Sequence, residues 1–360
     1  MSKYLLIAIF FLTSGLYAQN SQSISNVASE KSIFLIGESH TVKEKYDEIK
    51  AFAFGKIDQL EKGDAISFYF ELPYTINYAF YRILEHGDTT VFYEWFNHLY
   101  QKKDEPPSFF WTDYRDMILE LINYADKKDI EIELKGIDTE IVLRRTAFIL
   151  SQFDNSSENI IDSLLNLDYL SNDSSTKSIL FNQIEKLSTV TQNKVELDIL
   201  QTLIKSLEIG YAICKERDKF MLSSFMKYYD STAQLNFISL GLDHIVSKHD
   251  FSDSSSFFRM KYKLDTVDYQ SFYELMDNDL KAQTMRVGVL ELKIKIFYGN
   301  MFKRKDYKPI MNSKEREYIE KQLLNKDVYR VNVSKNKALS NLSKELDYLI
   351  IYKVSHYRWE

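Results

Sequence analysis

Two histidines follow short apolar runs in the same four-residue pattern, Gly-x-x-His. Ile33–Ile36 is followed by Gly37-Glu38-Ser39-His40, and Phe237–Leu240 is followed by Gly241-Leu242-Asp243-His244. Histidine titrates close to neutral pH and can take up or release a proton during a reaction. The pattern therefore indicates proton-transfer chemistry. His40 is the candidate general base, and His244 is a candidate second base, oxyanion donor or metal ligand.

Two further apolar runs each end at a carboxylate. Ile66–Phe70 is followed by Glu71, and Ile132–Ile137 is followed by Asp138. The carboxyl ends of parallel strands share one edge of an α/β sheet, and ligands bind in the crevice there. We therefore expect these carboxylates and Glu38 to lie with the two histidines at one site. Asp138 could equally cap the helix that follows it.

The composition argues against several classes of function. The chain has no G-x-S-x-G, no H-E-x-x-H, no cysteine-based zinc pattern and no phosphate-binding glycine loop. Its net charge of −6 is modest and well mixed, which does not indicate a nucleic-acid surface. The one cysteine, Cys214, lies in an apolar, helix-like stretch, which indicates a buried structural thiol.

The N-terminus has the features of a secretory signal. Met1–Lys3 carries positive charge, Tyr4–Leu16 is almost wholly apolar, and Ala18 offers a cleavage point. The apolar run is too short to span a bilayer comfortably, and no stop-transfer charges follow it. We expect residues 1–18 to be a signal peptide of an exported protein, periplasmic or secreted, with no membrane span after cleavage. A retained N-terminal anchor is the alternative.

Residues 19–360 are expected to form a single α/β domain. Hydrophobic residues make up 45% of the chain, and the low counts of 10 Gly and 4 Pro favour long helices. A helical pattern at 42–61 separates the first two strands, which predicts a parallel, right-handed βαβ unit. We predict a mostly parallel central sheet flanked by helices, with a helical insertion at about 155–230 over the carboxyl edge of the strands.

The remaining elements are predicted from periodicity and from turn residues. Helices are expected at 74–100 (two), 111–127, 140–152 and 185–229 (one or two). Further strands are expected at 235–240, 328–333 and 348–354.

The order of these motifs resembles that of the erythromycin esterase family and its wider superfamily, which includes haem-binding lipoproteins and the TraB/Tiki metal-dependent proteases. The resemblance runs from about Ile33 to Val246, with a weaker echo at 347–351. The matching motifs are Gly37-Glu38-Ser39-His40, Glu71, Gly136-Ile137-Asp138, Arg217-Asp218-Lys219-Phe220-Met221 and His244. A charged stripe such as the one around Arg217 is usually solvated, but the resemblance implies that Arg217 faces the site.

The motifs divide between branches of that superfamily. One residue fewer separates the Glu from the His than is usual in erythromycin esterases, and the Gly-x-x-His spacing is nearer to the haem-binding and protease branches. Gly-Ile-Asp, Arg-Asp-x-x-Met and the terminal strand fit the esterase branch better. The resemblance therefore supports the superfamily more firmly than any one substrate.

The residues favour a hydrolase that acts on an ester or related acyl bond of a small-molecule or peptide substrate. His40 would deprotonate a water molecule, and Glu38 and Glu71 would hold His40 in the productive tautomer. His244 and Arg217 would stabilise the developing oxyanion.

Two alternatives stay open at this stage. His40, Glu71 and His244 could hold a divalent metal that lowers the pKa of a bound water, as in a peptidase of the TraB/Tiki type. The second alternative is a binding protein and not an enzyme: it would hold haem or another ligand in the same cleft without turnover. Sensitivity to a chelator separates the metal variant from the metal-free one, and a Soret band on haem titration would indicate the binding protein.

Overall fold

The computed structural model describes residues 31–38, 44–97, 109–140, 142–153, 174–209, 215–247, 270–295, 301–303 and 310–356. Three sequence predictions fall outside these residues, namely the signal peptide at 1–18, the base His40 and the thiol Cys214, as does part of the predicted helical insertion, at 155–173 and 210–214. Among the described residues, no helix is long and apolar enough to cross a membrane.

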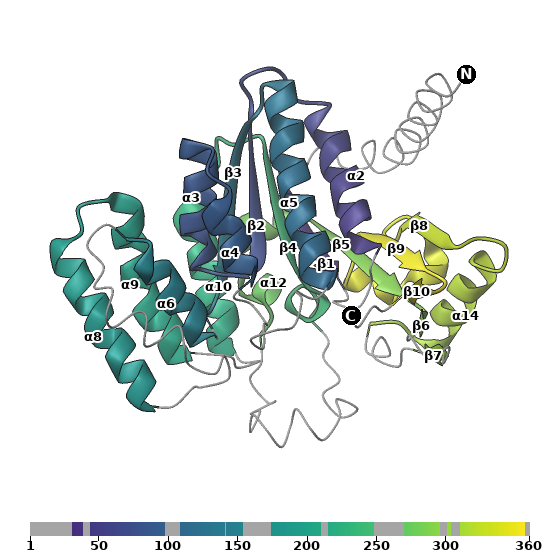
Figure 1. Cartoon of the computed structure of the whole chain (residues 1–360). Coiled ribbons are helices and arrows are strands. Elements are labelled where there is room, and N and C mark those ends of the chain that lie inside the picture. The colour runs from purple at the N-terminus through teal and green to yellow at the C-terminus, as the bar shows by residue number, and fades with distance from the viewer. Residues whose placement is uncertain are drawn as a thin grey trace, which may run out of the picture.

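A seven-stranded sheet forms the centre of the molecule (Figure 1), in the order β3-β2-β4-β1-β5-β9-β8. Its strands are β1 (Ile33–Glu38), β2 (Ala65–Pro73), β3 (Glu131–Asp138), β4 (Leu235–Gly241), β5 (Thr284–Glu291), β8 (Val328–Asn332) and β9 (Tyr348–Tyr352). Every neighbouring pair is parallel except β8 and β9. The predicted fold class is confirmed. A second, small sheet contains β6 (Lys293–Lys295), β7 (Met301–Lys303) and β10 (Ser355–His356).

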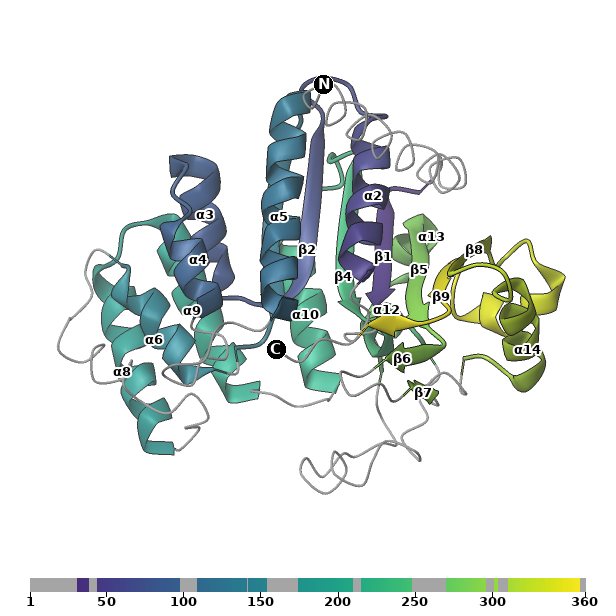
Figure 2. The same ribbon diagram turned by 45° about the vertical axis from the view of Figure 1, so that its right-hand side comes forward.

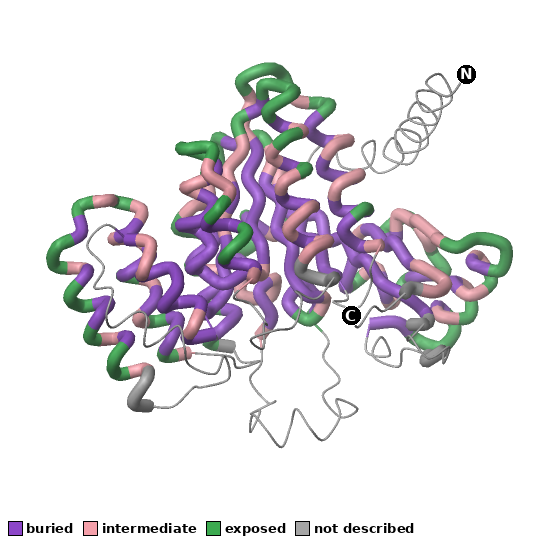
Figure 3. The backbone as a smooth tube through the Cα atoms, in the orientation of Figure 1, coloured by how far each residue is buried: buried purple, intermediate pink, exposed green. Residues whose placement is uncertain are grey.

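Helices cover both faces of the large sheet. One face packs against α2 (Lys45–Ile57) and α5 (Phe109–Lys128), and the other against α10 (Lys215–Tyr228), α12 (Phe272–Leu275) and α13 (Asn278–Gln283). The remaining helices are α3 (Ile76–His86), α4 (Thr90–Asn97), α6 (Leu143–Ser151), α8 (Ser174–Val190), α9 (Lys194–Ile209) and α14 (Ser313–Gln322). Figure 3 shows that the strands are buried along most of their length.

Successive residues of the central strands enter two separate hydrophobic clusters. In β1, Phe34 and Ile36 pack in the cluster beneath α2 and α5, whereas Leu35 packs with Met221 of α10. Side chains alternate between the two faces of a strand, so Glu38 continues the face of Phe34 and Ile36. A strand that is buried on both faces reads as a continuous apolar run, which is why these strands were visible in the sequence.

One central strand was not predicted. Thr284–Glu291 forms β5 between β1 and β9, and all eight of its residues are buried. Arg286 and Gly288 interrupt its apolar pattern. Arg286 donates to the Lys344 carbonyl oxygen at 2.9 Å and stacks over the Tyr273 ring, so its charge is accommodated without an apolar side chain. The strand could not be predicted from its apolar pattern, because the burial of this arginine depends on contacts with residues that are distant in the sequence.

The helical insertion differs in extent from its prediction. Helices α6, α8 and α9 stand together beside the sheet in both Figure 1 and Figure 2, and α8 packs against α9 and α6. In contrast, α10 packs on the sheet itself, where Met221 and Phe225 are fully buried. The stretch predicted as one or two helices at 185–229 therefore contains parts of three helices, and the last of them belongs to the core.

Gly37 has a different role from the sharp turn that its place in the motif suggests. It lies inside β1, where it pairs with Leu240 and Gly288. A Cβ atom on Gly37 would come within 2.1 Å of Ile245 Cδ1. The glycine therefore lets the segment after β4 approach β1 closely, and this contact brings Gly37 and Glu38 next to the segment that carries His244.

Candidate functional site

The sheet order brings four strand ends to one edge. β3, β2, β4 and β1 are consecutive neighbours and run in the same direction, so their carboxyl ends lie side by side. Glu38 and Asp138 are the last residues of their strands, Glu71 lies near the end of β2, and His244 ends the short 3₁₀ turn after β4. The topology thus places four of the predicted site residues at the same edge.

His40 is outside the described residues, so its position is not part of this geometry. It follows Glu38 by two residues along the chain, and Glu38 ends β1 at the same edge. Its role as the base stays a prediction.

Arg217 is the centre of the described cluster. Its Nε and Nη2 atoms donate to the two carboxylate oxygens of Asp138 at 2.8 and 2.6 Å, and Nη2 also donates to Glu71 Oε1 at 2.8 Å. The three side chains are 6%, 9% and 10% exposed. A paired guanidinium–carboxylate contact of this kind is strong and directional. The structure thus places Arg217 at the strand edge and not in solvent.

Helix α10 explains the spacing of the Arg-Asp-x-x-Met motif. Residues four apart lie on the same face of a helix, so Arg217 and Met221 both point toward the sheet. Met221 is fully buried in the core, which fixes the helix against the strands. Asp218, the next residue after Arg217, then points to the turn after β4.

Asp218 and Glu71 hold His244 from opposite sides. His244 Nδ1 lies 2.7 Å from Asp218 Oδ1, and Nε2 lies 3.3 Å from Glu71 Oε1. Asp218 Oδ1 also accepts the Phe272 backbone N–H at 2.9 Å, and Glu71 Oε2 accepts the Gly241 backbone N–H. Each ring nitrogen therefore has a carboxylate partner to which it can donate.

The electrostatics of this pocket favour the imidazolium form of His244. Burial alone lowers the pKa of this histidine, but the nearby charges and hydrogen bonds of Asp218 and Glu71 raise it well above 6.5. A ring that donates from both nitrogens accepts no proton and coordinates no metal. Both N–H groups of His244 already have carboxylate acceptors, so of the three predicted roles only stabilisation of an oxyanion is compatible with this geometry, and it would act through the positive charge of the ring.

The pKa of His244 predicts how stability depends on pH. A histidine whose folded pKa is raised adds stability that is fully present below its unfolded pKa, about 6.5, and is lost as the pH rises through the folded pKa. We therefore expect the difference in unfolding free energy between wild type and His244→Gln to be largest below about pH 6.5 and to shrink as the pH rises above that value. Urea unfolding at several pH values measures it. In an Asp218→Asn background the folded pKa is raised less, so the difference should be smaller and should vanish at lower pH. A difference that grows with pH would contradict the assignment.

Asp138 does not cap the helix that follows it. The residue at the N-cap of α6 is Val142, and Asp138 instead accepts the Thr139 backbone N–H at 2.7 Å and binds Arg217. The sequence left open whether Asp138 caps the next helix or lies at the carboxyl edge of the sheet. In the structure it lies at the edge of the sheet.

A second buried ion pair supports the turn that carries Asp138. Glu140 and Arg145 are fully buried and lie 2.6 Å apart. Glu140 also accepts from the Thr75 hydroxyl, and Trp95 Nε1 donates to the same hydroxyl at 3.0 Å. This network ties the end of β3 to the end of β2 and so positions the carboxylates of the site.

Glu38 forms an ion pair that the sequence did not indicate. Its carboxylate binds the ammonium group of Lys45, which lies in the first turn of α2 and is fully buried. Burial lowers the pKa of Lys45, against the opposing effect of Glu38, Glu71 and Glu291. The Lys45 ammonium also lies 4.7 Å from the centre of the Tyr46 ring.

Two tyrosines connect this ion pair to the rest of the site. The rings of Tyr46 and Tyr114 stack at 5.0 Å, and burial raises the pKa of both hydroxyls. The charges of Glu38, Glu71 and Asp138 raise the pKa of Tyr114 further, so this ring lies within electrostatic range of all three carboxylates.

Asp218, Lys45 and Tyr114 were not selected in the sequence analysis, and only Asp218 lies in a motif that could have indicated its place in the site. Asp218 stands inside the Arg-Asp-x-x-Met motif and could have been selected on that ground. Lys45 follows Glu44 in a charged stretch that reads as solvated, and Tyr114 is one of 25 tyrosines. Neither of these has a sequence signal of its own.

The predicted metal site of His40, Glu71 and His244 is only partly described, because His40 lies outside the described residues. Among them, no group of three or more His, Cys, Asp or Glu side chains could hold an ion. Arg217 Nη1 lies 3.5 Å from His244 Nε2, so a cation already stands where the predicted ligand would bind a metal.

Comparison with known proteins supports the fold. No family model matches the chain, and no curated protein matches it. A solved protein of Bacillus cereus shares 13% identity over 94% of this chain and 92% of its own, with a TM-score of 0.53. A succinoglycan biosynthesis protein shares 10% identity over 93% of this chain and 91% of its own, with a TM-score of 0.51.

A structure of ChaN of Campylobacter jejuni with cofacial haem is also similar, at 13% identity over 92% of this chain and 91% of its own. Its TM-score is 0.36. The first two likenesses show that the chain has an α/β fold found in other bacterial proteins over nearly its whole length. One fold can carry many activities, so function is argued from the site.

Proposed function

We propose that the protein is a hydrolase that activates water at the carboxyl edge of the sheet to cleave an ester or related acyl bond. The observation that carries the proposal is the buried series of alternating charges Asp218–His244–Glu71–Arg217–Asp138. Burying so many charges is costly for folding. Preorganised charges at a ligand-binding edge are what catalysis of acyl transfer uses.

The described residues would stabilise the transition state. Arg217 and His244 place two cationic groups 3.5 Å apart, and both are fixed by carboxylates that hold them in position. A carbonyl oxygen that becomes negative next to them would be stabilised as it forms. His244 would contribute its positive charge, because both of its N–H groups already donate to carboxylates, and it is not assigned as a base.

The proton transfers are assigned to His40. This residue would take a proton from water as the hydroxide oxygen bonds to the carbonyl carbon, and would return it to the leaving group as the acyl bond breaks. Glu38, two residues before His40, would help to orient it together with Glu71. No metal is needed in this scheme.

The motif resemblance supports the same proposal. The ordered motifs are similar to those of the erythromycin esterase superfamily, in which hydrolysis is one of the activities. Export of the chain after removal of residues 1–18 belongs to the proposal, since a periplasmic or secreted hydrolase would meet small-molecule or peptide substrates there. Peptide hydrolysis with a metal and ligand binding without turnover are the outcomes that the test distinguishes.

The test is a screen of ester and peptide substrates with wild type and His40→Ala, each with and without prolonged chelation. We expect hydrolysis by wild type that survives chelation, and a loss of at least about a hundredfold in His40→Ala with an unchanged melting temperature. His86→Ala, which changes an exposed histidine at the end of α3, is the matched control and should keep full activity.

Three results would overturn the proposal. Equal activity of His40→Ala would remove the assigned base. Activity lost on chelation and restored by a divalent metal would establish the metal variant. No hydrolysis by wild type together with a Soret band on haem titration would establish the binding protein.

A further inference from the structure

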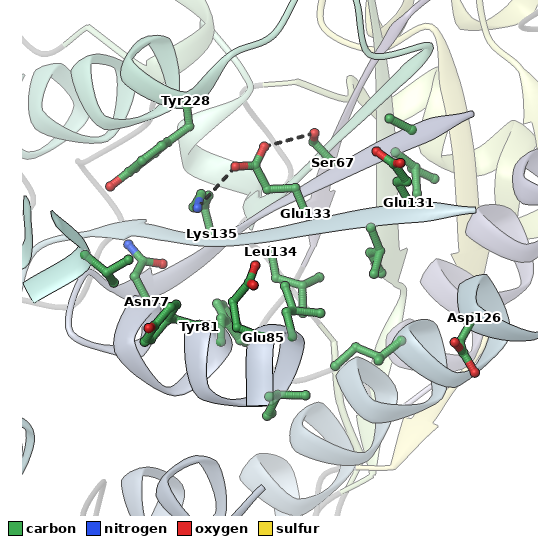
Figure 4. Close-up of a pocket in the computed structure, with 18 of the residues that line it drawn as sticks. Ser67, Asn77, Tyr81, Glu85, Asp126, Glu131, Glu133, Leu134, Lys135 and Tyr228 are labelled. Atoms are coloured by element: carbon green, nitrogen blue, oxygen red, sulfur yellow. Dashed lines mark hydrogen bonds and ion pairs between the residues drawn. The ribbon is translucent and has the colours of Figure 1, made fainter. Parts of the chain in front are cut away.

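A groove runs along the free edge of the large sheet, away from the site described above. Its volume is about 1260 Å³, and it is lined by β3 together with residues of α3, α5 and α9. Figure 4 shows β3 crossing the groove, with Glu133, Lys135 and Tyr228 on one side of the strand and Tyr81 and Glu85 on the other. None of the predicted site residues lines it.

The edge of β3 offers backbone groups for another strand. Glu131 N–H donates toward β2, to the Asp64 carbonyl oxygen at 2.8 Å. In a parallel pair, alternate residues direct both backbone groups to the same neighbour. The N–H and C=O groups of Ile132 and Leu134 therefore face the groove. Within the part of the chain that the structure describes, β3 ends the sheet, and no hydrogen bond reaches these four groups.

The side chain of Asn77 forms hydrogen bonds with the backbone N–H and C=O groups of Gly136, the next residue of β3 that faces the groove. The Asn77 side chain accepts the Gly136 N–H at 2.7 Å and donates to the Gly136 carbonyl oxygen at 3.0 Å. The side-chain amide of Asn77 thus supplies the donor and the acceptor that a neighbouring strand would supply to Gly136. It also marks where an added strand would have to end.

The two walls of the groove differ in chemistry. On the side of α3 and α5, the lining includes the apolar residues Phe80, Leu84, Leu119 and Ile122 together with the carboxylates Glu85 and Asp126. Six carboxylates but only two lysines line the groove as a whole. The carboxylates are Glu85, Asp126, Glu131, Glu133, Asp198 and Asp230. The groove is therefore amphipathic and acidic.

We propose that this groove binds an extended peptide that joins the sheet beside β3, with apolar residues alternating with lysine or arginine. Side chains alternate between the faces of a strand, so the apolar residues would pack toward α3 and α5. The basic residues would then point toward Glu133 and Asp198, which pair with Lys135 and Lys227, so each carboxylate would be shared between a lysine of the protein and the peptide. Addition of a strand to a sheet edge is a common form of peptide recognition.

Protection of the edge alone does not account for the groove. Charged residues such as Lys135 and Glu133 do discourage pairing between sheet edges. Lys135 is paired with Glu133 at 3.1 Å, however, and both side chains lie to one side of the strand (Figure 4). The backbone groups of Ile132, which is only partly buried, and the apolar residues opposite are left accessible to a chain of suitable charge, whereas Leu134 lines the groove at its buried end.

The test uses the full-length protein and a fluorescent peptide, acetyl-Lys-Val-Lys-Ile-Lys-Val-Lys-amide, with binding followed by anisotropy. Two N-methylated versions carry the methyl groups on the lysines or on the apolar residues. Because a strand presents alternate N–H groups to its neighbour, we expect one version to bind at least about tenfold more weakly and the other to bind as well as the parent. A peptide with glutamate in place of lysine should not bind.

Two protein variants and one amide measurement locate the site. Leu84→Asp should weaken binding at least about tenfold, whereas Leu324→Asp, which changes an exposed leucine outside the groove, should not. The Ile132 and Leu134 amides should become protected from hydrogen exchange when peptide is added.

The proposal is overturned if the peptide does not bind at about 1 mM, or if both N-methylated versions bind like the parent. It is also overturned if these two amides are already protected in the protein alone, since another segment or a second copy of the chain would then cover the edge.

Discussion

Replacing Arg217 by methionine should lower the free energy of unfolding by about 3–5 kcal/mol. The guanidinium binds Asp138 and Glu71, and all three side chains are at most 10% exposed. Without it, two carboxylates remain buried near each other with less compensation, which is far more costly than losing an exposed pair. Urea unfolding monitored by circular dichroism measures the change.

Arg316→Met is the matched control for this prediction. Arg316 pairs with Glu320 one turn away on α14, at 3.3 Å, and these side chains are 24% and 42% exposed. Removing a pair of this kind should cost no more than about 1 kcal/mol. If both substitutions cost the same, the Arg217 cluster is not the buried electrostatic centre described here. A double variant of Arg217→Met with Asp138→Asn should regain part of the loss.

Replacing Lys45 by methionine should also destabilise the protein by about 3–5 kcal/mol. Its ammonium group is fully buried against Glu38, whose side chain is 9% exposed. Methionine fills similar space but leaves the Glu38 carboxylate buried without its lysine. Addition of Glu38→Gln should recover much of the stability, because the amide removes the uncompensated charge. Unfolding of the single and double variants in urea gives the coupling energy.

Lys50→Met is the matched control on the same helix. It measures the loss of stability on replacing a lysine whose ion pairs are exposed to water. Lys50 lies 18% exposed beside Asp47 and Glu120, which are 57% and 52% exposed. Screening by water limits the value of such a pair to about 1 kcal/mol or less. A large loss in Lys50→Met, or no recovery in the Lys45→Met and Glu38→Gln double variant, would contradict the assigned role of the buried pair.

These two ion pairs also bear on the proposed hydrolase. The charges of Glu71 and Glu38 both act on Lys45, and those of Glu38, Glu71 and Asp138 act on Tyr114. The two parts of the cluster are thus electrostatically connected. Effects of neighbouring substitutions in such a network are not additive, so Arg217→Met and Lys45→Met combined should differ measurably from the sum of the two.

The positions of the strand-end residues could be predicted because they follow from short-range patterns. The apolar runs before Glu38, Glu71, Asp138 and Gly241 are visible since parallel strands are buried on both faces. A parallel arrangement then implies that their ends share an edge. The position of Arg217 could not be predicted in this way, because nothing in a charged helical stretch distinguishes a side chain that faces the sheet from one that faces water. Only the resemblance to a known family indicated its direction.

The sequence by itself determined the α/β class, the strands that end in acids and the edge at which the candidate site lies, because hydrophobic periodicity is a local property of the chain. Only the tertiary structure decided that Lys45 meets Glu38, that Asp218 and Glu71 hold His244 as a cation, and that Gly37 makes room for Ile245. These depend on which distant segments pack together. Burial and charge partners, which set the pKa of a side chain, exist only after that packing has formed.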